Sequence, residues 1–296
     1  MSLEIPNEEG RGVARYLDME VREITEGEGP VRLVGTAHPS ATVLDESGRM
    51  HMGVLGTMCD AIGGFCGGLG ALPDGWVVTT NMMLRAADRP VGAAISLESE
   101  VLRAGRTAVV TNVMARDEQG FVVGGIVRSA VLVPEGGPPP FARPARLDLA
   151  GRGEQFVPFD TWLDARPIAG GIEIELRDDF RNPWGIMHGG VTSALVDAAA
   201  RYAFHGTGRA TASRQSTQRV RGASEGPPAR ERSEQEARHV DDVVIHFVAP
   251  ARVGPVAAHV TVLGTRPDGT LVRVDVRDRG SNDRTVAFAV ATVGPR

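Results

Sequence analysis

The sequence predicts an α+β fold in which two similar domains follow each other in one chain. A thirteen-residue segment at 49–61 recurs 137 residues later, at 186–198, with six positions identical. Each copy is followed by four strand-like apolar runs, and a proline-rich stretch lies between the two halves. Because chance would rarely place a His and an Asp nine residues apart in both copies, the repeat indicates a duplication.

The strands are expected from apolar runs separated by turn residues. Alternation of apolar and polar residues, typical of half-buried strands, is clearest at 172–177 and 272–277. The runs that follow the repeated segment lie at 76–84, 94–102, 107–115 and 121–133 in the first half, and at 243–249, 256–263, 271–276 and 285–293 in the second. Each half is therefore expected to form one strand, one helix and four antiparallel strands.

The helices are expected at 53–67 and 190–204, the second of which is apolar nearly all round, as a buried helix is. A carboxylate in such a helix is costly to bury unless it is paired or used. Asp197 has Arg201 four residues on, so an ion pair along the helix is one interpretation. Asp60, its counterpart, has Gly64 at that position and no such partner.

The domain boundary is expected near residue 140, because the segment 134–140 is rich in proline and glycine. This gives an N-terminal domain at 1–138, a linker at 139–170 and a C-terminal domain at 171–296. The second half also carries an insertion at about 206–240 that is polar and rich in arginine, and we expect it to be mobile.

Composition narrows the class of protein. The 296 residues include 32 Lys plus Arg against 37 Asp plus Glu, a balance that disfavours a nucleic-acid surface. Without an 18-residue uncharged apolar stretch or an apolar N-terminus, we expect no membrane partner and a cytoplasmic location. Cys59 and Cys66 have no zinc-ligand spacing and are expected to be buried apolar residues, so no metal site is predicted.

The most specific motif precedes the second helix, where Asn182 begins the pattern Asn-x-x-Gly-x-x-His-Gly-Gly that ends at Gly190. Two glycines at a helix start leave N–H groups that can hold an oxyanion. With an acid nine residues after the His, the motif resembles that of hotdog-fold acyl-CoA thioesterases of the phenylacetate-pathway type, in the hydroxybenzoyl-CoA thioesterase superfamily. The resemblance covers 20–133 and 171–294, and it implies a tandem (double) hotdog.

The resemblance implies a long central helix wrapped by a curved antiparallel sheet in each half, with active sites where the halves meet. It assigns Asn182 and the Gly189 N–H to the thioester carbonyl, His188 to assistance nearby, and the acid to the role of nucleophile or general base. A hydroxyl residue early in the following strand, aligned with Thr79, would orient the attacking water.

The acid of each site is expected to come from the other half. Gly189 and Asp197 are eight residues apart on one helix, which separates them by about 12 Å. They therefore cannot both touch one carbonyl, and Asp60 completes the set of Asn182, His188 and Gly189. We also expect two residues that bind substrate, namely Gly190 and Met82.

The second site of the pair is expected to be degenerate. It would combine His51 and Asp197 with Asp45 in place of the amide, and Asp45 would repel an oxyanion. Met52 stands where the first glycine should be, and Val240 stands at the hydroxyl position and cannot orient water. The sequence therefore predicts one working site in each chain.

The predicted activity is hydrolysis of acyl-CoA thioesters to the free acid and CoA, with CoA as part of the substrate and no other cofactor. A dehydratase acting on acyl thioesters and a non-catalytic acyl-CoA binding or regulatory module remain alternatives, since a fold alone does not establish function. His188 could also simply cap its helix. The insertion's arginines could hold CoA phosphates or form a solvated loop. We expect a homodimer of chains, and the acyl group stays open.

Overall fold

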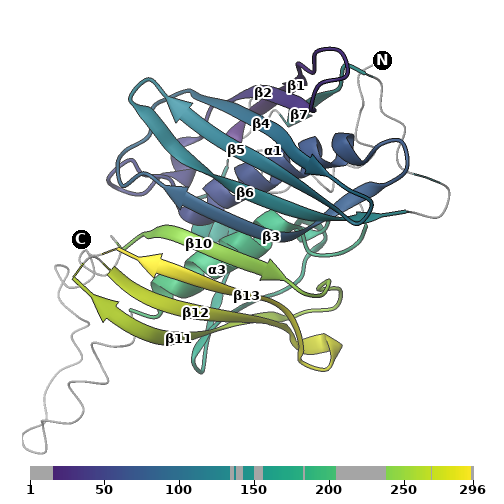
Figure 1. Cartoon of the computed structure of the whole chain (residues 1–296). Coiled ribbons are helices and arrows are strands. Elements are labelled where there is room, and N and C mark those ends of the chain that lie inside the picture. Colours follow the sequence, from purple (N-terminus) through teal and green to yellow (C-terminus); the bar gives the residue numbers. More distant parts are fainter. Residues whose placement is uncertain are drawn as a thin grey trace, which may run out of the picture.

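The computed structural model describes residues 16–133, 137, 143–149, 156–182, 184–204, 238–267 and 269–294. They form one thirteen-stranded sheet, in the order β7-β1-β2-β4-β5-β6-β3-β10-β13-β12-β11-β9-β8, and two long helices. Figure 1 shows helix α1 (Met52–Ala71) behind the first-half strands and α3 (Gly189–Tyr202) behind the second-half strands. Most of the insertion predicted at 206–240, with its predicted mobility, lies outside the described residues.

The first half contains the four strands predicted after its helix. They are β3 (Trp76–Ala86), β4 (Ile95–Ala104), β5 (Ala108–Asp117) and β6 (Gly120–Leu132). Two strands rather than one precede α1, and they are β1 (Met19–Glu23) and β2 (Arg32–Ala37). A short 3₁₀ turn, η3 (Ala41–Val43), leads into the helix.

The second half repeats this order. The strands after α3 are β10 (Val240–Phe247), β11 (Val256–Arg266), β12 (Gly269–Asp278) and β13 (Arg284–Val293), as predicted, with a 3₁₀ turn, η5 (Arg279–Ser281), between the last two. The strand β9 (Gly171–Ile174) and the 3₁₀ turn η4 (Asp178–Phe180) precede α3.

The segment predicted as a linker at 139–170 contributes regular structure to both halves. Its strand β7 (Arg146–Leu149) pairs with β1 at one outer edge of the sheet. Helix α2 (Phe159–Leu163) follows, and β8 (Arg166–Ile168) pairs with β9 at the other edge. Beside β1, the Arg143 guanidinium bonds Glu23, and these bonds hold the pKa of Glu23 below its usual value although burial raises it.

The two halves share their irregularities as well as their elements. An isolated β-bridge precedes each long helix. It joins Leu44 to Met50 in the first half and Arg181 to Met187, 137 positions later, in the second. Three register shifts, at Thr79/Asn81, Val101/Arg103 and Ala115/Arg116, recur at a constant offset of 161, at Val240/Asp242, Val262/Gly264 and Val276/Arg277. The offset between equivalent residues is thus 137 before the helices and 161 in the strands after them. The second half therefore has 24 more residues than the first between its long helix and the next strand.

The core lies between the sheet and the helices, which also pack directly on each other. Helix α1 is long and apolar enough to cross a membrane by composition, but 89% of its most apolar window is buried inside the protein, as in a core helix. At the centre of the sheet β3 pairs antiparallel with β10, and Met83 lies opposite Val244. This ladder and the helix pair join the two halves.

Glycines allow the close approach of the helices. A Cβ on Gly53 of α1 would lie 2.6 Å from Ala194 Cα, and one on Gly190 of α3 would lie 2.7 Å from Thr57 side-chain atoms. Between these two contacts Gly56 faces the Ser193 side chain. Because a Cβ at these positions would force the helices apart, the glycines fix how the α1 and α3 backbones meet.

We therefore expect Gly53→Ala to destabilise the protein by about 1–3 kcal/mol through overpacking, although alanine is the better helix former. Urea unfolding of wild type and variant measures the difference. The control is Gly264→Ala on β11, where an added methyl meets no atom within 4 Å and the expected change is within about 0.5 kcal/mol. Equal stability of Gly53→Ala and wild type would contradict this account of the helix contact.

Candidate active site

Asp60 projects from the middle of α1 and is 8% exposed. Its Oδ1 accepts a hydrogen bond of 2.7 Å from the Thr79 hydroxyl on β3. The structure thus brings the predicted acid and the predicted hydroxyl residue together. Since Thr79 can donate to the carboxylate while its oxygen accepts from water, the pair is able to hold a water molecule beside a base.

A register shift in β3 turns the Thr79 side chain toward α1. Thr79 lies three positions from the fully buried Met82, and on a regular strand two such residues point to opposite faces. The ladder of β3 with β6 shifts between Thr79 and Asn81, so Thr80 is the extra residue. Because of this bulge both Thr79 and Met82 face α1, and the equivalent bulge in β10 puts Val240 at the matching position.

The N-terminus of α3 faces Asp60 across the contact between the halves. A Cβ on Gly189 would lie 2.6 Å from Asp60 Oδ2, so only glycine fits beside this carboxylate. As the first residue of the helix, Gly189 has no helical partner for its N–H. A hydrogen-bond donor at a helix N-terminus and a carboxylate from the other half therefore flank the same point.

His188 caps α3 and also lies beside the acid. Its Nδ1 accepts a 2.9 Å hydrogen bond from the Gly190 N–H, which confirms the capping interpretation. The same nitrogen is 3.6 Å from Asp60 Oδ2, a distance of charge proximity and not of hydrogen bonding. In the neutral ring the proton therefore sits on Nε2, which is left to interact with a ligand.

Asn182 is fixed in the loop before α3. Its side-chain oxygen accepts hydrogen bonds from the N–H groups of Trp184, at 3.0 Å, and Ile186, at 3.3 Å. Within the described part of the chain its Nδ2 has no hydrogen-bond partner in the protein. The side chain is thus oriented by its oxygen and keeps its donor for another group.

The two residues predicted to bind substrate, Met82 and Gly190, both take part in the packing of α1 on α3. Met82 is fully buried, and its methyl group lies 3.5 Å from the position of a Cβ on Gly56, at the crossing of the helices. Gly190 uses its N–H in the helix cap and packs on Thr57. Sequence reasoning placed both near the site, but the packing of α1 on α3 accounts for each of them.

The residues predicted to form the degenerate site, Asp45, His51, Asp197 and Val240, are called the second constellation, and the set with Asp60 is the first. Ion pairs hold Asp197 of the second constellation. Asp197, 1% exposed, accepts a 3.1 Å bond from Arg201 Nε, and Arg201 Nη2 bonds Asp160 on α2 at 2.8 Å. The predicted Asp197–Arg201 pair is therefore confirmed. The other carboxylate oxygen, Asp197 Oδ1, is buried and has no hydrogen-bond partner among the described residues. Burial, and then the Arg201 charge, lowers the pKa of His51, which favours a neutral imidazole.

Two further residues of the second constellation differ from their counterparts. Asp45, in the first half, replaces Asn182, and Val240, in the second half, replaces Thr79. Burial raises the pKa of Asp45, but hydrogen bonds from Ser47 and from the Arg49 N–H outweigh it and hold that pKa below its usual value. Asp45 therefore stays ionised where the first constellation has the amide of Asn182. Val240 is buried and offers no hydroxyl.

The two cysteines are poor candidates for a nucleophile. Burial raises the pKa of the Cys59 thiol to about 12 and that of Cys66 to about 11. Both therefore remain thiols at neutral pH, and only a thiolate is reactive. This agrees with the expectation that they act as small apolar residues of the core.

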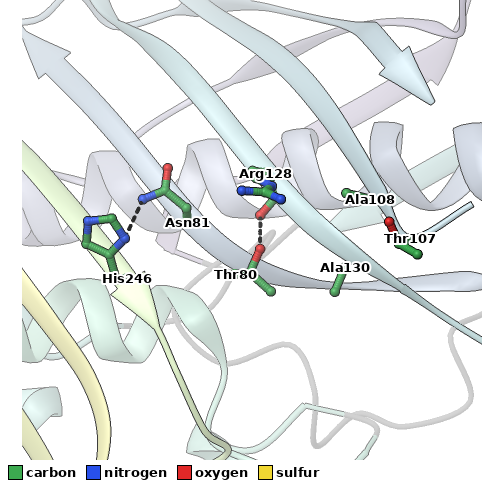
Figure 2. Close-up of a pocket in the computed structure, with 7 residues that line it drawn as sticks. All are labelled: Thr80, Asn81, Thr107, Ala108, Arg128, Ala130 and His246. Carbon is green, nitrogen blue, oxygen red and sulfur yellow. Dashed lines mark hydrogen bonds between the residues drawn. The ribbon is translucent and has the colours of Figure 1, made fainter. Parts of the chain in front are cut away.

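A hollow of about 430 Å³ lies elsewhere, on the face of the sheet turned away from α1 (Figure 2). Asn81 Nδ2 lies 3.2 Å from His246 Nδ1 across the β3–β10 junction, and the Thr80 hydroxyl donates to the Arg128 carbonyl oxygen. None of the predicted site residues lines it. The lining residues are Thr80, Asn81, Thr107, Ala108, Arg128, Ala130 and His246.

Sequence reasoning missed an ionic network at the entrance to β10. His239 Nε2 lies 2.8 Å from Asp241 Oδ1 and 3.0 Å from Asp88 Oδ1 of the first half. Arg49, just before the first helix, bonds both Asp88 and His239. Its members come from three distant parts of the chain, so no local spacing signals it.

Comparison with known proteins identifies the fold. No protein-family model and no curated protein sequence matches the chain. Solved structures match along nearly its whole length. A 12:0-ACP thioesterase from Umbellularia californica aligns with a TM-score of 0.55 and 11% identity, over 90% of this chain and 94% of that chain. The tesB protein of Mycobacterium avium subs paratuberculosis aligns with a TM-score of 0.54 and 15% identity, over 95% and 97%.

An acyl-ACP thioesterase from Bacteroides thetaiotaomicron also matches, with a TM-score of 0.50 and 15% identity, over 88% of this chain and 97% of that chain. The chain has the hotdog fold of these thioesterases. At such low identities the likeness establishes the fold alone. The roles of individual residues in this hotdog protein must therefore be argued from its own geometry.

The ionic network generates a pH prediction. The hydrogen bond to Asp241 raises the pKa of His239, with burial and Arg49 opposing and Asp88 assisting. A raised pKa in the folded state adds stability that is fully present below the unfolded value of about 6.5 and is lost as pH rises through the folded value. We expect the stability advantage of wild type over His239→Gln to be largest below about pH 6.5 and to shrink as pH rises above it.

Urea unfolding of both proteins at a series of pH values measures this advantage. Using the difference between the two proteins removes the titration of groups that they share. An advantage that stays constant or grows as pH rises would show that His239 does not gain protons on folding.

Proposed function

We propose that the protein hydrolyses acyl-CoA thioesters to the free acid and CoA at one composite site formed by both halves of the chain. The observation that carries this proposal is the position of Asp60, hydrogen-bonded to Thr79 and facing the Gly189 start of α3. A base with a water-orienting hydroxyl and a helix N-terminus on the opposite side are the parts that thioester hydrolysis requires.

The proposed reaction uses Asp60 as general base. Asp60 takes a proton from the water that Thr79 orients, while the water oxygen bonds to the thioester carbon. The carbonyl oxygen becomes an oxyanion, stabilised by the Gly189 N–H and the Asn182 amide. When the tetrahedral intermediate collapses, the carbon–sulfur bond breaks and the leaving thiolate takes up the proton held by Asp60. No metal or redox cofactor enters this scheme.

We also propose that the chain is a tandem of two hotdog domains with a single working site. The constant offsets of the bridges, bulges and glycine contacts support the duplication. The ionised Asp45, the paired Asp197 and the apolar Val240 support loss of activity in the second constellation. We expect the chain to act in the cytoplasm as a homodimer, with neither nucleic acid nor membrane as a partner.

The decisive measurement is thiol release from a panel of acyl-CoA and acyl-ACP substrates by wild type, Asp60→Asn and Asp197→Asn. Asp60→Asn removes the base, and we expect kcat to fall by about 10²–10⁴-fold. Asp197→Asn alters the equivalent carboxylate in the other half and should retain turnover. Including both carriers is necessary because two of the structures with this fold are described as acyl-ACP thioesterases.

Circular dichroism melts establish that each variant is folded. Loss of activity through Asp197→Asn alone would move the working site to the other constellation. Saturable binding of acyl-CoA by wild type without thiol release would favour a binding module, and formation of an enoyl thioester from a hydroxyacyl-CoA would favour the dehydratase.

Thr79→Val tests the hydroxyl and copies the residue of the other half, Val240. Since it removes a hydrogen bond to a charged group, worth about 1.5–3 kcal/mol, we expect kcat to fall about tenfold to a hundredfold. Thr79→Ser keeps the hydroxyl and should restore most of the rate. Equal kcat in the Val and Ser variants would exclude a role for the hydroxyl in positioning water.

A further inference from the structure

Gly64 lies one turn beyond Asp60 on α1, and packing does not explain why it is a glycine. A Cβ on the adjacent Gly63 would lie 2.9 Å from methyl groups of Val113 and Val127, so that position is tightly filled. Among the described residues, and leaving aside the backbone of α1 itself, the only atom within 4 Å of a Cβ added at Gly64 is Thr79 Oγ1, at 3.9 Å. Gly64 is also partly exposed, although it belongs to a largely buried helix. Open space therefore lies beside the Asp60–Thr79 pair.

The counterpart of Gly64 in the second half is Arg201, at the same offset of 137 that relates Asp60 to Asp197. The Arg201 side chain is only 13% exposed and is held by Asp197 on its own helix and by Asp160 on α2. Between the acid and this position both helices carry an alanine, Ala61 and Ala198. At this position α1 therefore has a glycine with space around it, whereas α3 has an ion-paired arginine.

The space over Gly64 is bounded by β3, which runs alongside α1 in the opposite direction. Trp76 covers the next turn of the helix, where a Cβ on Gly68 would lie 2.5 Å from its indole ring. Three residues further along β3, Thr79 reaches Asp60. Apart from the Asp60 carboxylate at one end, the described residues around the space are thus an alanine, a glycine, a threonine and an indole, none of which carries a charge. Such a surface suits a hydrocarbon and offers nothing to the phosphates of CoA.

The geometry points to Gly64 as the residue that determines acyl specificity, with the acyl group lying over it between Thr79 and Trp76. Arg201 fills the equivalent space in the second half and excludes an acyl group there. This inference rests on the proposed thioesterase function and adds the location of the acyl group and the reason for the closure of the second site. Residue 64 sets the size of the group that reaches Asp60.

Side chains of increasing size at residue 64 test the inference. We expect Gly64→Ala and Gly64→Leu to lower kcat/KM progressively, with the loss growing to more than tenfold for the largest acyl groups that wild type hydrolyses. Inhibition by free CoA should stay unchanged, because the CoA portion lies elsewhere. Gly64→Ala should also raise the melting temperature slightly, since alanine favours the helix and meets no clash. An equal loss for all acyl groups, or weaker CoA inhibition, would overturn the inference.

A reciprocal variant, Gly64→Arg, copies the second half into the first. The new guanidinium is expected to pair with Asp60 and to abolish binding of S-alkyl-CoA thioethers, which mimic the substrate and are not hydrolysed. Titration calorimetry measures this binding without turnover. A folded Gly64→Arg protein that binds the thioethers as wild type does would overturn the inference. If this variant does not fold, the Ala and Leu series with the same thioethers decides the matter.

The two proposals can fail separately. Wild type that binds thioethers in a manner dependent on residue 64, but releases no thiol, would overturn the hydrolase and support the acyl site. Wild type that hydrolyses acyl-CoA with a chain-length preference unaffected at residue 64 would overturn the acyl site and leave the hydrolase standing. Absence of both binding and turnover would overturn both.

Discussion

The close contact between α1 and α3 is the constraint on which the rest of the molecule depends. Because Gly53 and Gly190 carry no Cβ, the backbone of α1 approaches that of α3 at Ala194, and the start of α3 packs on Thr57 near the middle of α1. Only at this separation does Gly189 face the carboxylate of Asp60. The ladder between β3 and β10 fixes the same relation from the sheet side. The candidate site is thus a product of how two halves pack, and neither half contains it alone.

The two halves have used the same helix position in opposite ways. In the first, Asp60 accepts a hydrogen bond from a neutral hydroxyl and lies one turn from Gly64, which carries no side chain. In the second, Asp197 is neutralised by Arg201, and one of its oxygens lacks a partner among the described residues. A buried pair of this kind contributes little net stability but is costly to break by removing one partner.

Much of this arrangement could be predicted from the sequence. The repeat and the eight strands after the helices followed from spacing and alternation, whereas the facing of Asp60 with Gly189 followed from helix geometry together with the residue roles that the thioesterase resemblance implies. The side of β3 on which Thr79 lies did not follow from alternation, because the bulge at Thr80 reverses the parity and no local residue pattern announces it. The strand β7 escaped prediction since its pairing partner, β1, lies more than a hundred residues away. The full burial of Met82 could not be predicted either, because a core methionine and a pocket methionine look alike in sequence.

Joining both halves in one polypeptide has a consequence for how such a protein can change. In a pair of identical subunits every substitution is made twice, so an arginine at the position of Arg201 would appear on both helices at once. In this chain the two equivalent positions, Gly64 and Arg201, are separate residues and can differ. At this position α3 carries an ionic contact between Arg201 and Asp160 of α2, for which Gly64 of α1 offers no counterpart. A single chain with two similar halves therefore allows differences between them that the symmetry of identical subunits forbids.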